Sequence, residues 1–158
     1  MYQSCLFIRN SSLYLGIIRI VLNILVIDGM GGGIGKAVVE FLKPEYAEYI
    51  TAIGTNALAT SAMLKAGASR GATGENAVIY NCKSADIIIG PIGIVLADSM
   101  LGEISPAIAV AIAASPAQKI LIPVQNCNAA VVGLSGKPLA QHYEEIVTII
   151  KNSQGQSA

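Results

Sequence analysis

The sequence predicts an α/β fold: a three-layer αβα sandwich in which helices cover both faces of a mostly parallel sheet of about five strands. Two observations support this fold class. Apolar runs of strand length alternate with segments of helix length along the chain. Turns rich in glycine or asparagine follow these runs, and in an open parallel sheet such turns gather at the carboxyl edge, where ligands bind. We therefore expect one ligand-binding edge.

The composition indicates a single globular domain with a large apolar core. The chain has 158 residues, of which 53% are hydrophobic and 13% charged, and its formal net charge is +0. Because no basic cluster is present, the sequence gives no reason to expect nucleic acid or a membrane as a partner. The cysteines Cys5, Cys82 and Cys127 are odd in number and form no C-x-x-C motif, which argues against disulfides and structural zinc. We expect a cytoplasmic protein with no metal.

The apolar segment from Leu13 to Ile27 is not predicted to cross a membrane. Arg19 and Asn23 interrupt it, so no uninterrupted run of about 18 apolar residues exists. A secretory signal is not expected either, because no small-residue cleavage site precedes the first core strand.

The domain is expected to cover residues 23–151. Residues 1–22 are interpreted as an extension outside it, and a GTG start codon encoding Val21 would make them an over-extended reading frame. Residues 152–158 are polar and are expected to form a flexible tail.

The first predicted strand, Ile24 to Asp28, is an apolar run that leads into glycines. A helix follows from Ile34 to about Leu42, and Pro44 is predicted to end it because proline removes a helical hydrogen bond. The second predicted strand is Ile50 to Ile53.

Ala57 to Ala66 contains good helix formers and is followed by Gly67, a residue typical of the position after a helix. The next part is ambiguous, because a β-rich stretch lies too close to the following strand for a parallel crossover. We therefore predict a short strand at Ala68 to Ala72, and then a helix from Gly74 to Ser84 with Thr73 as its N-cap.

The fourth predicted strand is Asp86 to Ile89, and a helical stretch follows Gly93 through Asp98. Ser105 is predicted to cap an apolar helix that begins at Pro106. The remaining elements are a last strand and an amphipathic closing helix, at Lys119 to Val124 and Pro138 to Lys151.

The predicted helix at 106–114 contains only Pro, Ala, Ile and Val, so a monomer would expose part of an apolar surface. We expect a partner subunit to cover it, which predicts a homodimer or a higher homo-oligomer. The alternative is that residues 94–101 of the same chain cover this helix.

The turn after the first strand is the most informative motif. Its glycines would let backbone N–H groups approach a phosphate, and the start of a helix adds unsatisfied donors. The G-x-x-x-G-I-G spacing at Gly29, Gly33, Ile34 and Gly35 is similar to the turn of short-chain dehydrogenases. A Walker loop is excluded, because Ala37 stands where a magnesium-binding Ser or Thr is required.

The candidate binding residues follow the predicted strands. They are Asp28, Gly29, Gly31, Gly32, Gly33, Gly35, Lys36, Thr55, Asn56, Arg70, Thr73, Gly90 and Gly93. A further asparagine-rich turn follows the last strand at Gln125 to Asn128. The glycines would supply backbone donors, and the alternative is a tight turn with nothing bound.

Several of these side chains have a structural alternative. Asp28 would contact a ribose or a metal, or it would cap the following turn. Lys36 would reach a phosphate, or it is a solvated helix lysine. Arg70 would bind a phosphate or carboxylate, or it would form a surface pair with Glu75.

The remaining candidates for chemistry are few. Asp98 and Glu103 would serve as acid and base if they converge, and the alternative is a solvated helix face. Cys82 and Cys127 are interpreted as buried apolar residues rather than nucleophiles, and His142 as a surface residue. The catalytic residues are unknown.

Several long motifs carry a family resemblance: VIDGMGGGIGK, AIGTNALATSAMLKAGASRGATGENAV, ADIIIGPIGIVLADSMLGEISPA and ILIPVQNCN. They resemble the bacterial domain-of-unknown-function family 3842 over about Asn23 to Lys151. This resemblance implies a small cytoplasmic Rossmann-like protein and no established activity. The turn at Gly54 and Thr55 is similar to methylglyoxal-synthase-like domains in architecture only, because their catalytic D-P and P-H-x-x-D motifs are missing.

The leading interpretation is an uncharacterised Rossmann-like protein whose glycine loop binds a phosphate-bearing small ligand, either a nucleotide or a phosphorylated metabolite. The first alternative is a short-chain-dehydrogenase-like NAD(P) oxidoreductase. Thr55 and Asn56 stand where such enzymes carry an acid, and no tyrosine is followed four residues later by lysine, which weakens that alternative. The second is a non-catalytic oligomeric interaction module with a vestigial loop. Whether the protein is an enzyme stays open.

Overall fold

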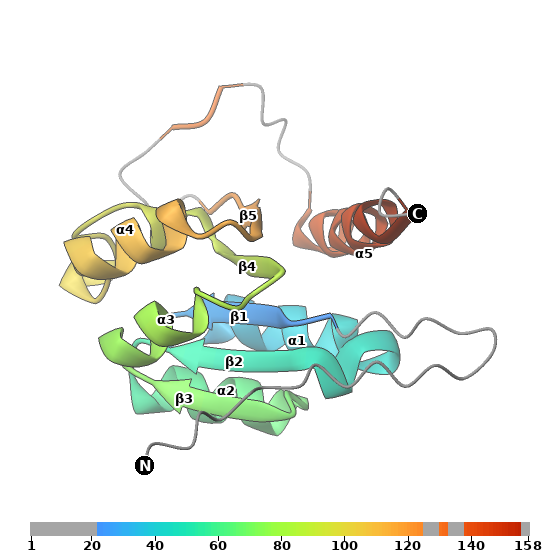
Figure 1. Ribbon diagram of the computed structural model, residues 1–158, viewed down its shortest axis with the longest axis horizontal. Coiled ribbons are helices and arrows are strands. Elements are labelled where there is room, and N and C mark those ends of the chain that lie inside the picture. The colour runs from blue at the N-terminus through green and yellow to red at the C-terminus, as the bar shows by residue number, and fades with distance from the viewer. Residues whose placement is uncertain (1–21, 125–129, 133–137, 156–158) are drawn as a thin grey trace, which may run out of the picture.

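The protein is an α/β domain built on one parallel sheet, seen in a computed structural model that describes residues 22–124, 130–132 and 138–155 (Figure 1). The sheet order is β3-β2-β1-β4-β5, so β1 is central and the chain crosses to opposite sides from it. The strands are β1 (Ile24–Asp28), β2 (Ile50–Gly54), β3 (Arg70–Thr73), β4 (Ile87–Pro91) and β5 (Gln118–Ile122).

Helices connect the strands and complete the layers. The α-helices are α1 (Gly33–Tyr46), α2 (Ala57–Ala66), α3 (Glu75–Asn81), α4 (Pro106–Ala114) and α5 (Leu139–Gly155). Short 3-10 helices lie at η1 (Ala47–Tyr49), η2 (Ile92–Val95) and η3 (Met100–Gly102). This arrangement confirms the predicted Rossmann-like α/β class, with all five strands parallel.

The central strand is apolar on both faces because helices cover both faces. Ile24 and Val26 pack into one core with residues of α1, α2 and α5. Leu25 and Ile27 point the other way and pack with residues of α3 and α4. All five residues of β1 are buried, including Asp28 at its carboxyl end.

The prediction of a helix before β4 is confirmed, since α3 occupies most of the ambiguous stretch. Its N-cap is Gly74 rather than Thr73. The preceding strand begins at Arg70, later than predicted. Ala57 to Ala66 is helical as predicted and ends at Gly67, whose φ is 123°.

Two helix predictions are wrong. Pro44 does not end α1, because Leu42 and Tyr46 are buried against the core and hold the final turn in place. The stretch after Gly93 is not an α-helix either. It forms η2, an irregular connection and η3, in which Met100 and Leu101 adopt left-handed φ angles that an α-helix does not contain.

The chain ends also differ from expectation. β5 stops at Ile122 and α5 continues to Gly155, so most of the predicted tail is helical. Of the predicted extension at 1–22, residues 1–21 lie outside the described residues, as does the turn at Gln125 to Asn128; Leu22 is described, and it is buried in the core rather than outside the domain. Within the described part of the chain, no helix has the length and apolar character needed to span a lipid bilayer.

The N-cap of α4 supplies a stability test. The Ser105 hydroxyl oxygen accepts a hydrogen bond from the Ile108 amide at 3.2 Å, as the sequence predicts. Replacing Ser105 with Ala leaves this amide unpaired, so we expect the free energy of unfolding to fall by about 1 kcal/mol. Urea denaturation measures this loss. Ser105→Asn, which retains a capping oxygen, should recover most of it, and equal stability of the Ala variant and the wild type would contradict the capping role.

Candidate functional site

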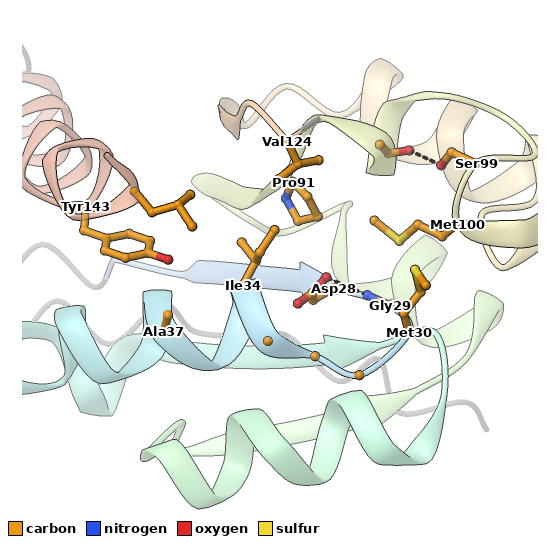
Figure 2. Close-up of a pocket in the computed structure, with 15 residues that line it drawn as sticks. Asp28, Gly29, Met30, Ile34, Ala37, Pro91, Ser99, Met100, Val124 and Tyr143 are labelled. Atoms are coloured by element: carbon orange, nitrogen blue, oxygen red, sulfur yellow. Dashed lines mark hydrogen bonds between the residues drawn. The ribbon is translucent and has the colours of Figure 1, made fainter. Parts of the chain in front are cut away.

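A pocket of about 440 Å³ lies at the carboxyl edge of the sheet, between the ends of β1 and β4 (Figure 2). In a sheet of this order, that is the point where the connections leave in opposite directions and where ligands bind. The glycine loop and α1 form one wall, and the others come from the end of β4 and the segment after it, from Val124 beyond β5, and from α5. The lining residues are Asp28, Gly29, Met30, Gly31, Gly32, Gly33, Ile34, Ala37, Pro91, Gly93, Ser99, Met100, Val124, Leu139 and Tyr143.

The Asp28 carboxylate holds the two ends of the glycine loop. It accepts the Gly29 amide at 2.8 Å on Oδ1 and the Gly35 amide at 2.7 Å on Oδ2. One side chain therefore joins the end of β1 to the first turn of α1. The predicted alternative of a turn-capping Asp28 is the arrangement observed, although the acceptors reach the helix as well as the adjacent residue.

The environment of Asp28 disfavours its charge. The side chain is 4% exposed. Burial raises the pKa of this carboxyl above its ordinary value, while the hydrogen bonds from the Gly35, Gly29 and Ile34 amides oppose the increase. The two donated amides partly replace the lost water, so the carboxyl is held in place even where it is desolvated.

Two loop amides remain available. Among the described residues, neither the Gly31 nor the Gly33 amide donates a hydrogen bond, whereas the amides of Gly29, Met30, Gly32 and Gly35 all do. Both available amides belong to residues that line the pocket.

The glycines of the loop fall into two groups. A Cβ at Gly32 would lie 2.7 Å from the Ala59 Cα, and its φ is +69°. A Cβ at Gly35 would lie 2.5 Å from the Met63 sulfur. These positions require glycine for packing. A Cβ at Gly31 or Gly33 would meet nothing within 4 Å, and neither residue has a positive φ, so the fold does not require glycine there.

A second carboxylate closes the loop from the side of β2. Glu103 Oε2 accepts the Met30 amide at 2.8 Å, the Asn56 side-chain amide at 2.9 Å and the Thr55 hydroxyl. Burial acts to raise the pKa of the Glu103 carboxyl, but the hydrogen bonds from Thr55, Met30 and Asn56 outweigh it and lower the pKa below the ordinary value. Glu103 is therefore held as an anion.

Glu103 reaches this position because of residues 96–104, which we call the strap. The strap runs from η2 to the start of α4, and its Ser99 hydroxyl donates to the Gly93 carbonyl at 2.6 Å. Asp98, Met100 and Leu101 have φ values of 63°, 54° and 58°. Non-glycine residues in this region are strained, and such strain concentrates at functional sites.

The wall opposite the strap comes from α5. Figure 2 shows the Tyr143 ring with its hydroxyl directed toward the side of the pocket where Ile34 and Asp28 lie. The ring packs on Phe41 of α1, with centroids 5.8 Å apart. Burial raises the pKa of the Tyr143 hydroxyl, and the Asp28 carboxylate raises it further. Tyr143 is thus a neutral hydrogen-bonding group in a largely apolar wall.

Six of the candidate binding residues line the pocket: Asp28, Gly29, Gly31, Gly32, Gly33 and Gly93. The other candidates have different surroundings. Thr55 and Asn56 hold Glu103, and Thr73 bonds to the Thr60 hydroxyl at 2.7 Å. Gly90 lets β4 approach β1, since its Cβ would lie 2.3 Å from the Ile27 carbonyl oxygen.

The expectation that Arg70 faces the ligand-binding edge is wrong. In the β2–β3 register Arg70 lies opposite Thr51, near the amino end of the strands, and it is exposed. The strand is Arg70–Thr73 rather than Ala68 to Ala72, so Arg70 is its first residue instead of its middle one and lies farther from the carboxyl turn. Lys36 does not line the pocket either. It is 3.7 Å from Glu40 in a solvated pair, which matches its structural alternative.

The sequence did not identify several lining residues, namely Met30, Ile34, Ala37, Pro91, Ser99, Met100, Val124, Leu139 and Tyr143. Most are apolar and carry no recognisable motif. Cys82 is buried as predicted, and burial raises the pKa of its thiol to about 11, so it is not a reactive thiolate. His142 is partly buried and lies 3.7 Å from Glu145, so its assignment to the surface holds only in part. Within the ranges covered, no group of three or more His, Cys, Asp or Glu residues is arranged to hold a metal ion.

Comparison with known proteins identifies one family. The family described as Domain of unknown function (DUF3842) matches residues 23–155. No curated protein and no solved structure matches the chain. The match confirms the resemblance drawn from the sequence motifs, and its description names no activity.

The lowered pKa of Glu103 predicts a pH-dependent contribution to stability. Because the folded state favours the charged form, the contribution is present above the unfolded pKa of about 4.3 and is lost as the pH falls through the lower folded pKa. We expect Glu103→Gln to destabilise the protein by about 1 kcal/mol at pH 7, and this difference to shrink steadily below about pH 4. Urea denaturation of both proteins across this range measures it; a difference independent of pH would contradict the charged role.

Proposed function

The chain belongs to the DUF3842 family, and because that description names no activity, we propose from the site itself that the protein binds a phosphate-bearing small molecule. The phosphate is held by the glycine loop, and the rest of the ligand fills the pocket between the loop, the strap and α5. The proposal covers nucleotides and phosphorylated metabolites. It assigns binding and no reaction.

The observation that carries this proposal is the pair Gly31 and Gly33, which have no side chains and whose amides donate to no protein group among the described residues. A glycine costs about 0.5–1 kcal/mol of conformational entropy relative to alanine in regular structure. Neither position needs glycine for packing or for a positive φ. A ligand that approaches the backbone closely explains both glycines, and the two available amides are the donors that a phosphate accepts.

Neither carboxylate beside the loop accepts a hydrogen bond from the Gly31 or Gly33 amide, the two donors proposed for the phosphate. Asp28 is already paired with two amides below the loop, and Glu103 is paired with three donors on the side of β2. The start of α1 adds partial positive charge on the pocket side. Because α1 extends over 14 residues, its dipole is fully developed at Gly33.

The remainder of the pocket fits an apolar or planar group with few polar atoms. Its volume lies within the range of about 300–1,000 Å³ typical of small-molecule sites. Ile34, Pro91 and Met100 supply apolar surface, and the Tyr143 hydroxyl supplies one hydrogen-bonding group. A vestigial loop in a pure interaction module would not need the bare surface at Gly31 and Gly33, which favours binding over that alternative.

The sharpest test is Gly33→Ala. The added methyl group enters open space, so we expect the free energy of unfolding to stay unchanged or to rise by about 0.4–1 kcal/mol. The same methyl group blocks close approach of a phosphate, so affinity should fall about tenfold or more. Urea denaturation measures the stability, and amide NMR shifts followed during titration with inorganic phosphate measure the affinity. In the wild type, the Gly31 and Gly33 signals should move in a saturable manner.

Two further variants define the controls. Ala57→Gly makes the reverse exchange of these two residue types, at the first position of α2. This position lies outside the pocket, so the variant should leave phosphate binding intact. Gly35→Val is unsuitable as a binding test, because its side chain would collide with Met63 and Asp28 and destabilise the fold. Wild-type signals for Gly31 and Gly33 that do not respond to phosphate, or full binding by Gly33→Ala, would refute the proposal.

A second proposal concerns assembly. Helix α4 has Ile108 and Ile112 in the core, while Val110 is 65% exposed on its outer face among exposed alanines. This exposed apolar face supports a homodimer or a higher homo-oligomer in which a second copy covers α4.

Light scattering at micromolar concentration should therefore give at least a dimer mass. Val110→Glu should convert it to monomer, because a charge on the covered face cannot be desolvated without a partner. Lys65→Glu, on a solvated helix position of α2, is a control for a charge change away from α4. A strictly monomeric wild type would disprove this assembly.

A further inference from the structure

The side of the glycine loop that faces β2 leads to a narrower ligand class, and this inference rests on the proposed phosphate site. In sheets of this order, a dinucleotide crosses the glycine loop and extends to both sides of β1. One ribose then lies near the end of β2, where an acid accepts its hydroxyl groups. The residues at the end of β2 decide whether that half of the ligand fits.

The polar groups at the end of β2 are already engaged. The Thr55 hydroxyl donates to Glu103 Oε2. The Asn56 side-chain amide donates to Glu103 Oε2 and to the Met30 carbonyl, both at 2.9 Å, and its oxygen accepts the Ala59 amide at 2.9 Å. A ribose at this position would have to break these bonds, since the side-chain groups that could receive it already have partners.

The path across the loop is also closed. A Cβ built on Gly29 would lie 2.8 Å from the Met100 sulfur, 2.8 Å from the Thr55 hydroxyl oxygen and 2.9 Å from Glu103 Oε2. Three side chains therefore cover Gly29 on the side of β2. By contrast, the space above Gly31 and Gly33 is open. The loop is accessible from the pocket and covered where a dinucleotide would cross it.

The charge of Glu103 also disfavours binding of a dinucleotide. The three donors hold the carboxylate as an anion beside the loop. It also occupies the Met30 amide, which a second phosphate group would otherwise use. A pyrophosphate crossing Gly29 would lose that donor and meet a fixed negative charge at close range.

We propose that the site accepts a ligand with a single phosphorylated unit, such as a nucleoside monophosphate or a sugar phosphate, and that Glu103 is the residue that excludes dinucleotides. The end of β2 does not fit the adenosine half of NAD or NADP. Glu103 does not line the pocket, so it determines specificity by closing one side of the loop.

NAD and its two halves, AMP and nicotinamide mononucleotide, are matched probes for this idea. Calorimetric titrations of the full-length protein should give no measurable NAD binding in the wild type. Glu103→Ala should bind NAD measurably, with an affinity about tenfold or more above the weakest that the wild-type titration would detect, because it removes both the obstruction and the charge. Glu103→Gln keeps an acceptor for Thr55 and Asn56, so the strap stays closed and NAD stays excluded.

Controls separate folding from specificity. Glu75→Ala removes a carboxylate that contacts Ser105 rather than the loop, and it should not admit NAD. Amide NMR spectra establish that each variant is folded. If Glu103→Ala does not fold, Thr55→Val removes one of the donors that hold Glu103 and should also raise NAD affinity.

The outcomes distinguish this inference from the proposed function. Saturable phosphate shifts at Gly31 and Gly33 combined with NAD binding by the wild type would retain the phosphate site and overturn the exclusion. NAD binding that is lost in Glu103→Ala would overturn it too, and would make Glu103 the acceptor for a ribose. The phosphate titration is carried out without NAD, and the absence of any response in it would refute the phosphate site. The proposed exclusion of dinucleotides, which rests on that site, would fall with it.

Discussion

The carboxylate of Asp28 holds the end of β1 and the start of α1 in one arrangement, and the candidate site is built on it. Its two oxygens accept amides at Gly29 and Gly35, on either side of the turn. Between these anchors the Met30 amide donates to Glu103 and the Gly32 amide to the Gly29 carbonyl, whereas Gly31 and Gly33, whose amides donate to no group in the described part of the chain, line the pocket. Burying a carboxyl group is unfavourable, as its raised pKa indicates, so two well-placed donors are needed to keep it there.

The glycines of the loop have two different roles. Gly32 and Gly35 pack against α2 residues so closely that any side chain would collide, and they let α1 approach α2. Gly31 and Gly33 have no such neighbours and face the pocket. A motif written as a run of glycines therefore contains two kinds of position, which differ in what a methyl group would do. The first kind is required for packing, and the second is the basis of the proposed phosphate site.

Local chemistry explains which features the sequence could predict. The apolar strand at Ile24 to Asp28, the Gly67 stop and the Ser105 cap all depend on residues close in sequence, and they were predicted. Pro44 was misread because burial of Tyr46, a tertiary effect, outweighs the local signal. Arg70 was misplaced because a shift in where β3 begins decides which end of the sheet a residue occupies. Tyr143 was missed because a lone tyrosine on an amphipathic helix carries no motif.

The strap shows why this part of the site could not be predicted from the sequence of residues 96–104 alone. Its left-handed residues Met100 and Leu101 each cost about 1–2 kcal/mol, and Leu101 is 95% exposed, so packing of its own side chain does not compensate that cost. The compensation comes from the ends of the strap. Ile104 is fully buried in the core beside α4, and Glu103 receives three hydrogen bonds from the glycine loop and the end of β2. The strained turn and the closed side of the loop therefore form together, because the contacts that hold the one create the other.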